Sequence, residues 1–125
     1  MRDPTEHAWT MLKRLGRYLK ATPRVVIRFE RQQMPRTIEV SVDSDWAGCL
    51  KTRKSTTGLA VMFGGHSLKT QSNRQSNIAF SSGEAEYGAM VKGCAVALGI
   101  QSYTRDLGMN LELVVWSDSK AAIGI

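Results

Sequence analysis

Cysteine is scarce in this sequence. Only Cys49 and Cys94 occur, and they belong to no Cys-x-x-Cys pair. Two isolated cysteines support neither a zinc site nor a disulfide framework. We therefore expect a fold held by its apolar core, in a reducing intracellular compartment.

Long apolar runs are missing as well. No stretch approaches the roughly 20 apolar residues of a membrane-spanning helix, and the N-terminus lacks the apolar core of a signal peptide. The 125 residues, 42% of them hydrophobic, are enough for one domain with a core of ordinary size and a flanking segment. We expect a soluble protein.

Acidic residues are absent from residues 46–80, which hold five basic ones. Residues 1–36 are also basic, with nine Lys or Arg against three acidic residues, so this segment carries the whole net charge of +6. Both patches would attract a polyanion such as nucleic acid. The alternative is a solvated face that only keeps the protein soluble.

The first segment, residues 1–36, is predicted to be a basic helix followed by a connection. The helix is predicted to begin at Asp3 as N-cap, with Pro4 at the first helical position, and to end before Pro23. Apolar residues recur inside it at helical spacing, as expected of a packing element or, alternatively, of a helix that binds nucleic acid. A short strand is predicted over 24–29, before the main domain.

The main domain, residues 37–125, is predicted to be α/β. Alternation and turn signals indicate strands over 37–45, 59–63 and 66–72, which we expect to be antiparallel. A helix over 81–107 then crosses to a fourth strand over 111–118, parallel to the first and buried on both faces. Ser119 is predicted to cap a further helix.

The long helix raises two expectations. Its apolar stripe is predicted to comprise Tyr87, Met90, Val91, Cys94 and Leu98. Gly88, Gly93 and Gly99 inside it each cost roughly 1 kcal/mol relative to alanine, which close packing of the helix on the sheet would offset.

Two glutamates near the start of this helix have different predicted roles. Ser81 and Glu84 stand in the Ser-x-x-Glu relation of a capping box. Glu86 lies about 200° further round the helix and faces another side. Glu84 is therefore predicted to be structural and Glu86 to be available for chemistry.

Three carboxylates from separate elements converge if the first and fourth strands are neighbours: Asp43, Glu86 and Asp118. Crowded carboxylates repel one another unless a cation neutralises them, and oxygen ligands suit Mg²⁺ or Mn²⁺. Two such ions about 4 Å apart can activate water and stabilise the leaving oxygen of a phosphodiester. Taken alone, three such residues are more often unrelated surface acids, and the positions at the strand ends do not reverse this preference.

Several motifs occur in a familiar order: "VDSDWAG" (42–48), "TRKSTTGLAVMFGG" (52–65), "IAFSSGEAEYGAM" (78–90) and "VVWSDSKAAIGI" (114–125). Together they resemble the ribonuclease H domain of copia-type retrotransposon polyproteins. "HAWTMLKRLGRYLKATP" (7–23) is similar to the segment that joins the reverse transcriptase to that domain.

The resemblance implies a ribonuclease H-like fold that cleaves the RNA strand of an RNA–DNA hybrid with two Mg²⁺ ions, for which Mn²⁺ could substitute. By position, Asp43 would bridge the ions, Glu86 would hold one and help position the water, and Asp118 would anchor the other. The reverse transcriptase of the same polyprotein would be a partner, in a cytoplasmic retroelement particle or the nucleus. Such domains continue through a last strand and helix and a fourth acidic ligand, which this sequence does not include.

The remaining candidates are second-rank. Asp45 either holds the metal-ligating carboxylates in position or is a turn residue. Trp46 could stack on a base, but we expect it to belong to the core. Six polar or basic residues are predicted to contact the backbone of the hybrid or its 2′-hydroxyls; the alternative is that they are solvated loop residues. They are Arg53, Lys54, Lys69, Gln71, Asn73 and Arg74. The alternative function is a non-catalytic remnant that binds nucleic acid or packs on the reverse transcriptase.

Overall fold

The computed structural model describes residues 5–124 of the chain. The chain divides into two compact units, Met1–Glu30 and Arg31–Ile125. Residues 31–36, which the sequence placed in the first segment, lie in the second unit because Gln32 is bonded there. Its Nε2 donates to the carbonyl of Phe63 at 2.9 Å, and its Oε1 accepts from the Gly65 amide at 2.8 Å.

The first unit holds one helix, α1 (Glu6–Ala21), none of whose residues is buried. The predicted cap is wrong: Thr5 is the N-cap, and its hydroxyl accepts from the Ala8 amide at 3.1 Å. Asp3 and Pro4 lie outside the described residues. No described helix is long and apolar enough to span a membrane.

The predicted strand over 24–29 is also wrong, since this segment has no regular secondary structure. A strand is stabilised by a hydrogen-bonded neighbour and by burial of one face. No such neighbour is present among the described residues, and Val25 and Val26 are 74% and 84% exposed. The β-branched composition alone was not sufficient.

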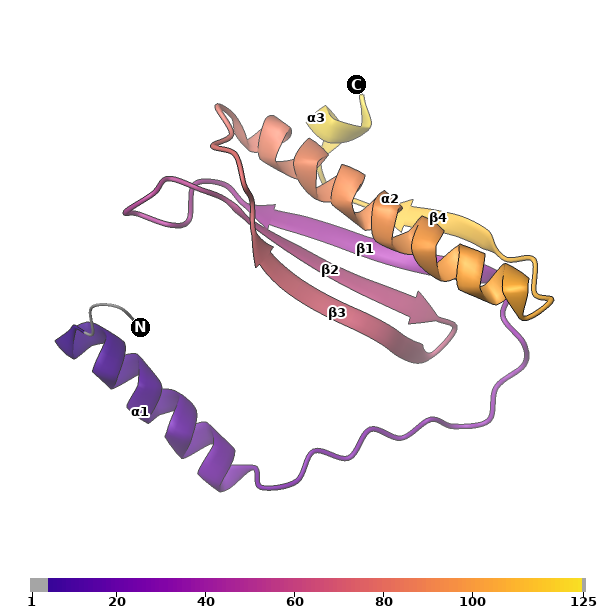
Figure 1. Cartoon of the computed structure of the whole chain (residues 1–125), viewed down its shortest axis with the longest axis horizontal. Helices are drawn as coiled ribbons and strands as arrows, with labels where there is room; N and C mark the ends of the chain where they lie inside the picture. Colours follow the sequence, from indigo (N-terminus) through magenta and orange to yellow (C-terminus); the bar gives the residue numbers. More distant parts are fainter. Residues whose placement is uncertain (1–4, 125) are drawn as a thin grey trace. The chain divides into compact units, whose positions relative to one another are not determined.

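The second unit is built on a four-stranded sheet of β1 (Thr37–Asp45), β2 (Thr56–Phe63), β3 (His66–Arg74) and β4 (Glu112–Trp116). The order is β3-β2-β1-β4, with β1 antiparallel to β2, β2 antiparallel to β3, and β1 parallel to β4. This confirms the predicted α/β topology (Figure 1).

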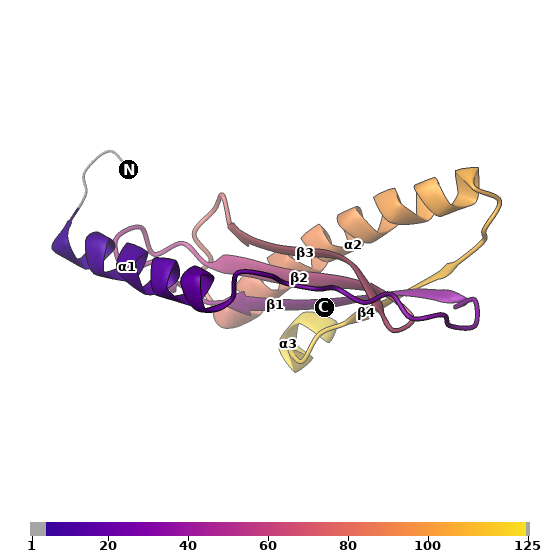
Figure 2. The same ribbon diagram turned by 90° about the horizontal axis from the view of Figure 1, so that it is seen from below.

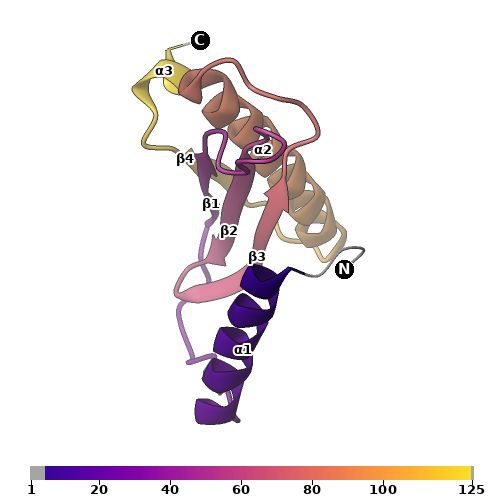
Figure 3. The ribbon, with the colours of Figure 1, turned by 90° about the vertical axis from the view of Figure 1, so that its left-hand side faces the viewer.

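Helix α2 (Ser82–Asp106) makes the crossover between β3 and β4, and the short helix α3 (Lys120–Ile123) follows β4. Figures 2 and 3 show α2 on one side of the sheet, running along its strands. The predicted cap of the last helix is confirmed, because the Ser119 hydroxyl accepts from the Ala122 amide at 3.2 Å.

The core lies between the sheet and α2. The strands contribute Ile38, Val40, Val42, Leu59 and Val61. The helix contributes small residues at a spacing of four, namely Ala85, Ala89, Gly93 and Ala97. The predicted apolar stripe of α2 is therefore wrong in most of its residues, because the fully buried face consists of these small residues.

Three of the predicted residues are exposed instead: Tyr87, Val91 and Leu98 are 45%, 53% and 56% exposed. Met90 is partly buried and packs against the core, and Cys94 is partly buried. Strand β4 also differs from its prediction, since none of its residues is fully buried. It is an edge strand of this sheet, so only its inward residues Leu113 and Val115 pack against the core.

Gly93 explains the small-residue face of α2. A Cβ atom built at this position would lie 2.4 Å from Cγ1 of Val42, far inside van der Waals contact. Gly99 is different, because its added Cβ would have no neighbour within 4 Å. Close packing thus offsets the low helix propensity of glycine at Gly93, as expected, but not at Gly99.

We predict opposite effects of alanine at these two glycines. Gly93→Ala should lower the free energy of unfolding by about 1–3 kcal/mol, because the added methyl overpacks the helix against Val42. Gly99→Ala should raise it by about 0.5–1 kcal/mol through helix propensity alone. Urea unfolding of the whole chain measures both, and equal effects of the two changes would refute the packing role of Gly93.

Candidate metal centre

Three carboxylates meet where β1 and β4 separate. The last paired residues of these strands are Ser41 and Trp116, after which the two chains diverge. Asp43 lies on β1 just beyond this point. The sequence had predicted Asp118 as the last residue of the fourth strand, but β4 ends two residues before it.

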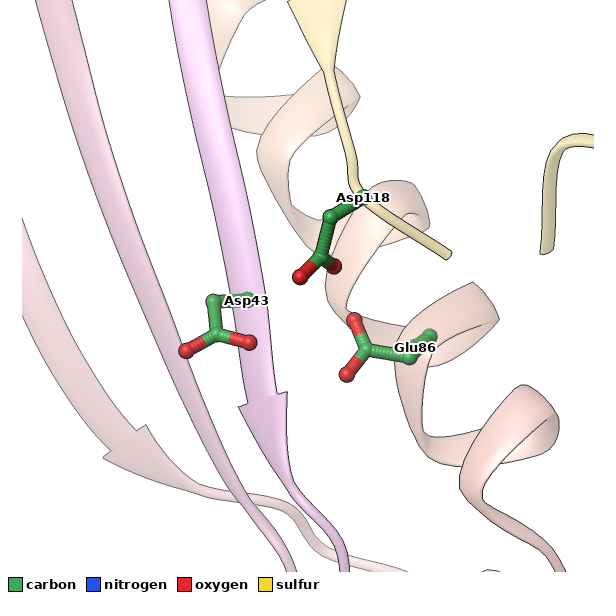
Figure 4. Close-up of side chains that lie close together, drawn as sticks. All are labelled: Asp43, Glu86 and Asp118. Carbon is green, nitrogen blue, oxygen red and sulfur yellow. The ribbon is translucent and has the colours of Figure 1, made fainter. Parts of the chain in front are cut away.

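Glu86 of α2 completes the group. One carboxylate oxygen from each of Asp43, Glu86 and Asp118 lies within 4.8 Å of the other two. Figure 4 shows the three side chains pointing into a common space from β1, α2 and the segment after β4. The convergence predicted from the strand order is therefore present in the structure.

The start of α2 is fixed by the predicted capping box. The Ser81 hydroxyl accepts from the Glu84 amide at 3.1 Å, and Glu84 Oε2 accepts from the Phe80 amide at 2.7 Å. Glu84 thus satisfies a backbone donor one residue before the cap. Its carboxylate has a structural partner, whereas that of Glu86 points to the other carboxylates.

A single backbone donor links two of the three acids. The Ser44 amide donates to Asp43 Oδ1 at 2.8 Å and to Glu86 Oε1 at 3.2 Å. The other oxygen of Glu86, Oε2, is shielded from solvent and has no hydrogen-bond partner. Buried carboxylate oxygens are normally satisfied, so this orphaned atom points to a missing ligand.

The electrostatics of the site favour a cation. Burial raises the pKa of Glu86 above its ordinary value, and the negative charges of Asp43 and Asp118 raise it further, against the opposing effect of the Ser44 amide. Among residues 5–124, no lysine or arginine forms an ion pair with any of the three. An oxygen-lined site with uncompensated negative charge fits Mg²⁺ or Mn²⁺.

Asp45 has the second of its two predicted roles, that of a turn residue. Its Oδ1 accepts a hydrogen bond from the Thr56 amide across the loop between β1 and β2. Gly48 packs so closely against it that an added Cβ would lie 2.1 Å from Asp45 Oδ2. Trp46, expected in the core, is 48% exposed and donates from Nε1 to the carbonyl of Ala79 at 3.0 Å.

The six predicted nucleic-acid contacts do not surround the carboxylates. Lys54 is held within the fold, because its ammonium donates to the carbonyl of Ser76. Arg53 lies in the exposed loop after β1, with a left-handed φ of 55°. The other four, Lys69, Gln71, Asn73 and Arg74, lie along the edge strand β3.

Trp116 is a site residue that the sequence analysis missed. With Asp43 and Asp118 it lines a groove of about 350 Å³, and its indole Nε1 donates to Glu39 Oε2 at 3.0 Å. The signal was present, because a tryptophan two residues before a predicted metal ligand lies on the strand that carries it. Its ring is 56% exposed beside the metal centre.

The mixed sheet and its three carboxylates define a chain of the ribonuclease H-like fold class. No protein-family model matches the chain. It is 33% identical, over 98% of its length, to the retrovirus-related Pol polyprotein from transposon RE2 of Arabidopsis thaliana. It is 30% identical over its full length to that from transposon TNT 1-94 of Nicotiana tabacum.

A third relative, secreted RxLR effector protein 161 of Plasmopara viticola, is 34% identical over 82% of this chain and 72% of that protein. Over nearly its whole length the chain is homologous to a segment of retrovirus-related Pol polyproteins of copia-type transposons. It spans only 8% and 9% of the two polyproteins named above.

We predict that Glu86→Gln stabilises the metal-free protein at neutral pH. A carboxylate whose folded pKa is raised contributes stability below its unfolded pKa, and this contribution is lost as the pH rises through the folded value. The melting temperature of the variant in EDTA should therefore match that of the wild type in acid and exceed it at pH 7.

The matched control is Glu84→Gln, which replaces a carboxylate two residues away on the same helix. It weakens the bond to the Phe80 amide and should lower the melting temperature at pH 7 by an amount corresponding to about 0.5–1 kcal/mol. A Glu86→Gln protein that melts below the wild type at every pH would contradict the assignment of unpaired charge to this site.

Proposed function

We propose that this chain is a metal-dependent endonuclease that cleaves the RNA strand of RNA–DNA hybrids within a retroelement polyprotein. The observation that carries the proposal is the meeting of Asp43, Glu86 and Asp118 within 4.8 Å. The family membership supports the retroelement setting, with a reverse transcriptase domain of the same polyprotein as partner.

The three carboxylates would hold two Mg²⁺ ions, or Mn²⁺ in their place. When bound, such ions lower the pKa of water and neutralise charge that develops on the phosphodiester. The protein's part is to keep the ligands in place. The Ser44 amide orients the carboxylates of Asp43 and Glu86, and the capping box fixes the first turn of α2, just before Glu86.

The expected reaction is hydrolysis of one phosphodiester of the RNA strand. A water oxygen adds to phosphorus, one P–O ester bond breaks, and the leaving oxygen takes up a proton. Trp116, with its exposed ring beside Asp43 and Asp118, would contact the sugar or base next to the cleaved bond. The 2′-hydroxyl is the group by which a strand of RNA can be told from DNA.

The second candidate is a binding module that keeps the fold without the chemistry. The specific observation in its favour is the distribution of charge, because no basic residue of β3 or of the loop after β1 lines the groove that holds Asp43 and Asp118. Such a module would bind a duplex in a salt-dependent manner and leave it uncut.

We predict that the chain cleaves end-labelled RNA–DNA hybrid with Mg²⁺ or Mn²⁺, and that Asp118→Asn reduces the rate by about 10²–10³-fold, the scale of losing one group that stabilises developing charge. Glu86→Gln should have a similar effect. Denaturing gels of the labelled RNA strand measure both.

Glu84→Gln is the control for this assay, since its effect on stability should leave most of the activity. Hybrid that binds the wild type and stays uncut would favour the binding module. Cleavage that persists in both Asp118→Asn and Glu86→Gln would show that another site, or a contaminant, does the chemistry.

Metal binding has a readout that does not depend on cleavage. Mn²⁺ at about 100 times its dissociation constant should stabilise the wild-type chain by about 2.7 kcal/mol through mass action. Because the binding carboxylates are then incomplete, Glu86→Gln and Asp118→Asn should lose most of this shift in thermal unfolding. Equal shifts in all three proteins would place the metal elsewhere.

A further inference from the structure

A second cavity lies on the flank of α2 that faces away from Glu86. Its volume is about 470 Å³. It is formed by the end of β3, the loop that follows and the first half of α2. Its lining includes Asn73, Arg74, Asn77, Tyr87, Gly88 and Lys92.

The position follows from helix geometry. Gly88 and Lys92 are one turn apart on α2, so they share a flank. Glu86 precedes Gly88 by two residues, which is about 200° of helix, and faces the metal centre instead. One helix therefore separates the two sites, with carboxylates on one side and this cavity on the other.

The cavity is positively charged. Arg74 and Lys92 line it, and within residues 5–124 neither forms an ion pair with a carboxylate. The lining holds a single acidic residue, Glu84, whose Oε2 already accepts from the Phe80 amide. Because the segment 46–80 has no acidic residue at all, the loop after β3 adds no negative charge that would offset these cations.

The inner wall is built rather than loosely assembled. Gln75 lines it, and its side-chain Nε2 donates to the Thr57 hydroxyl at 3.0 Å and to the carbonyl of Ala85 at 2.9 Å. The backbone amide of Gln75 also donates to the carbonyl of Ser55 at 2.8 Å. These bonds join β2, the loop and α2, so the backbone around the cavity is held in place before any ligand arrives.

We propose that this cavity binds a phosphate group of a nucleic-acid strand. Two unpaired cations and the amide donors of Asn73 and Asn77 suit the oxygens of a phosphate. The ring of Tyr87, 45% exposed in the lining, offers a surface on which a base can stack, a combination found in proteins that follow single strands. The choice of a strand as the source of the phosphate rests on the proposed function.

Gly88 provides the sharpest test. It is exposed in the lining, and an added Cβ would lie 3.6 Å from Gln75, an ordinary contact. Gly88→Glu places a carboxylate in the cavity, four residues before Lys92, where it can pair with that lysine. Gly88→Ala makes the same change to the backbone without the charge, and both should fold at least as stably as the wild type.

We predict that Gly88→Glu weakens binding of a fluorescent RNA–DNA hybrid by about tenfold at low salt, whereas Gly88→Ala binds like the wild type. Binding is measured by anisotropy in EDTA, so cleavage plays no part. A Gly88→Glu protein that binds like Gly88→Ala, with the same melting temperature, would overturn the proposal.

The cations are tested by the double change Arg74→Gln with Lys92→Gln. It should lower the slope of log affinity against log salt by about two, because each removed cation leaves one phosphate without its neutralising partner. Arg105→Gln, an exposed change near the far end of α2, is the control and should leave the slope unchanged. An unchanged slope in the double variant would also count against the site.

Two further arms separate the possible causes of failure. Adenosine 5′-phosphate is tested in place of the hybrid, to compare a free nucleotide with a strand. If it binds the wild type and not Gly88→Glu, the result supports a phosphate site in this cavity. Cleavage by Asp118→Asn tests the metal centre, whereas hybrid binding by the Gly88 pair in EDTA involves neither metal nor cleavage and tests the cavity.

Discussion

The close approach of α2 to β1 is the constraint on which the rest of this structure depends. At Gly93 the helix lies so near Val42 that no side chain fits between them. Alanines one turn to either side continue this small face. A helix held at this depth brings its first turns past the end of β1, where Glu86 can share the Ser44 amide with Asp43. A larger residue at position 93 would move the helix outward, and the carboxylates would separate.

The same helix keeps opposite charges apart. Glu86 lies on one flank, and Lys92, with Arg74 across from it, lies on the other. An arginine beside the three acids would pair with them, lower their pKa values and remove the need for a metal ion. Because no described lysine or arginine forms an ion pair with the three acids, their negative charge would be available to the divalent ions of the proposed function, and Arg74 and Lys92 would be available to the proposed phosphate.

Sequence patterns predicted the sheet and the acidic site well, for physical reasons. Strand β1 has a strict alternation because one face is buried, and the rule for crossover connections then placed Asp118 beside Asp43. The face of α2 was not predictable in this way. A hydrophobicity pattern predicts that the largest apolar residues, such as Val91 and Leu98, form the buried face of a helix. Where the helix packs closely on the sheet, only the smallest residues fit on that face. Strand prediction failed at 24–29 because β-branched residues without a neighbouring strand gain nothing from extension.

The metal centre and the stability of the fold are in conflict. Burial of Glu86, together with the negative charges of Asp43 and Asp118, raises its pKa, and a charged Glu86 therefore raises the free energy of the folded chain. The capping box and the small face of α2 act in the opposite direction, since they hold the helix in place whether or not a metal is bound. A site of this kind is formed before its ligands arrive, and binding of divalent ions then removes repulsion instead of having to order the chain.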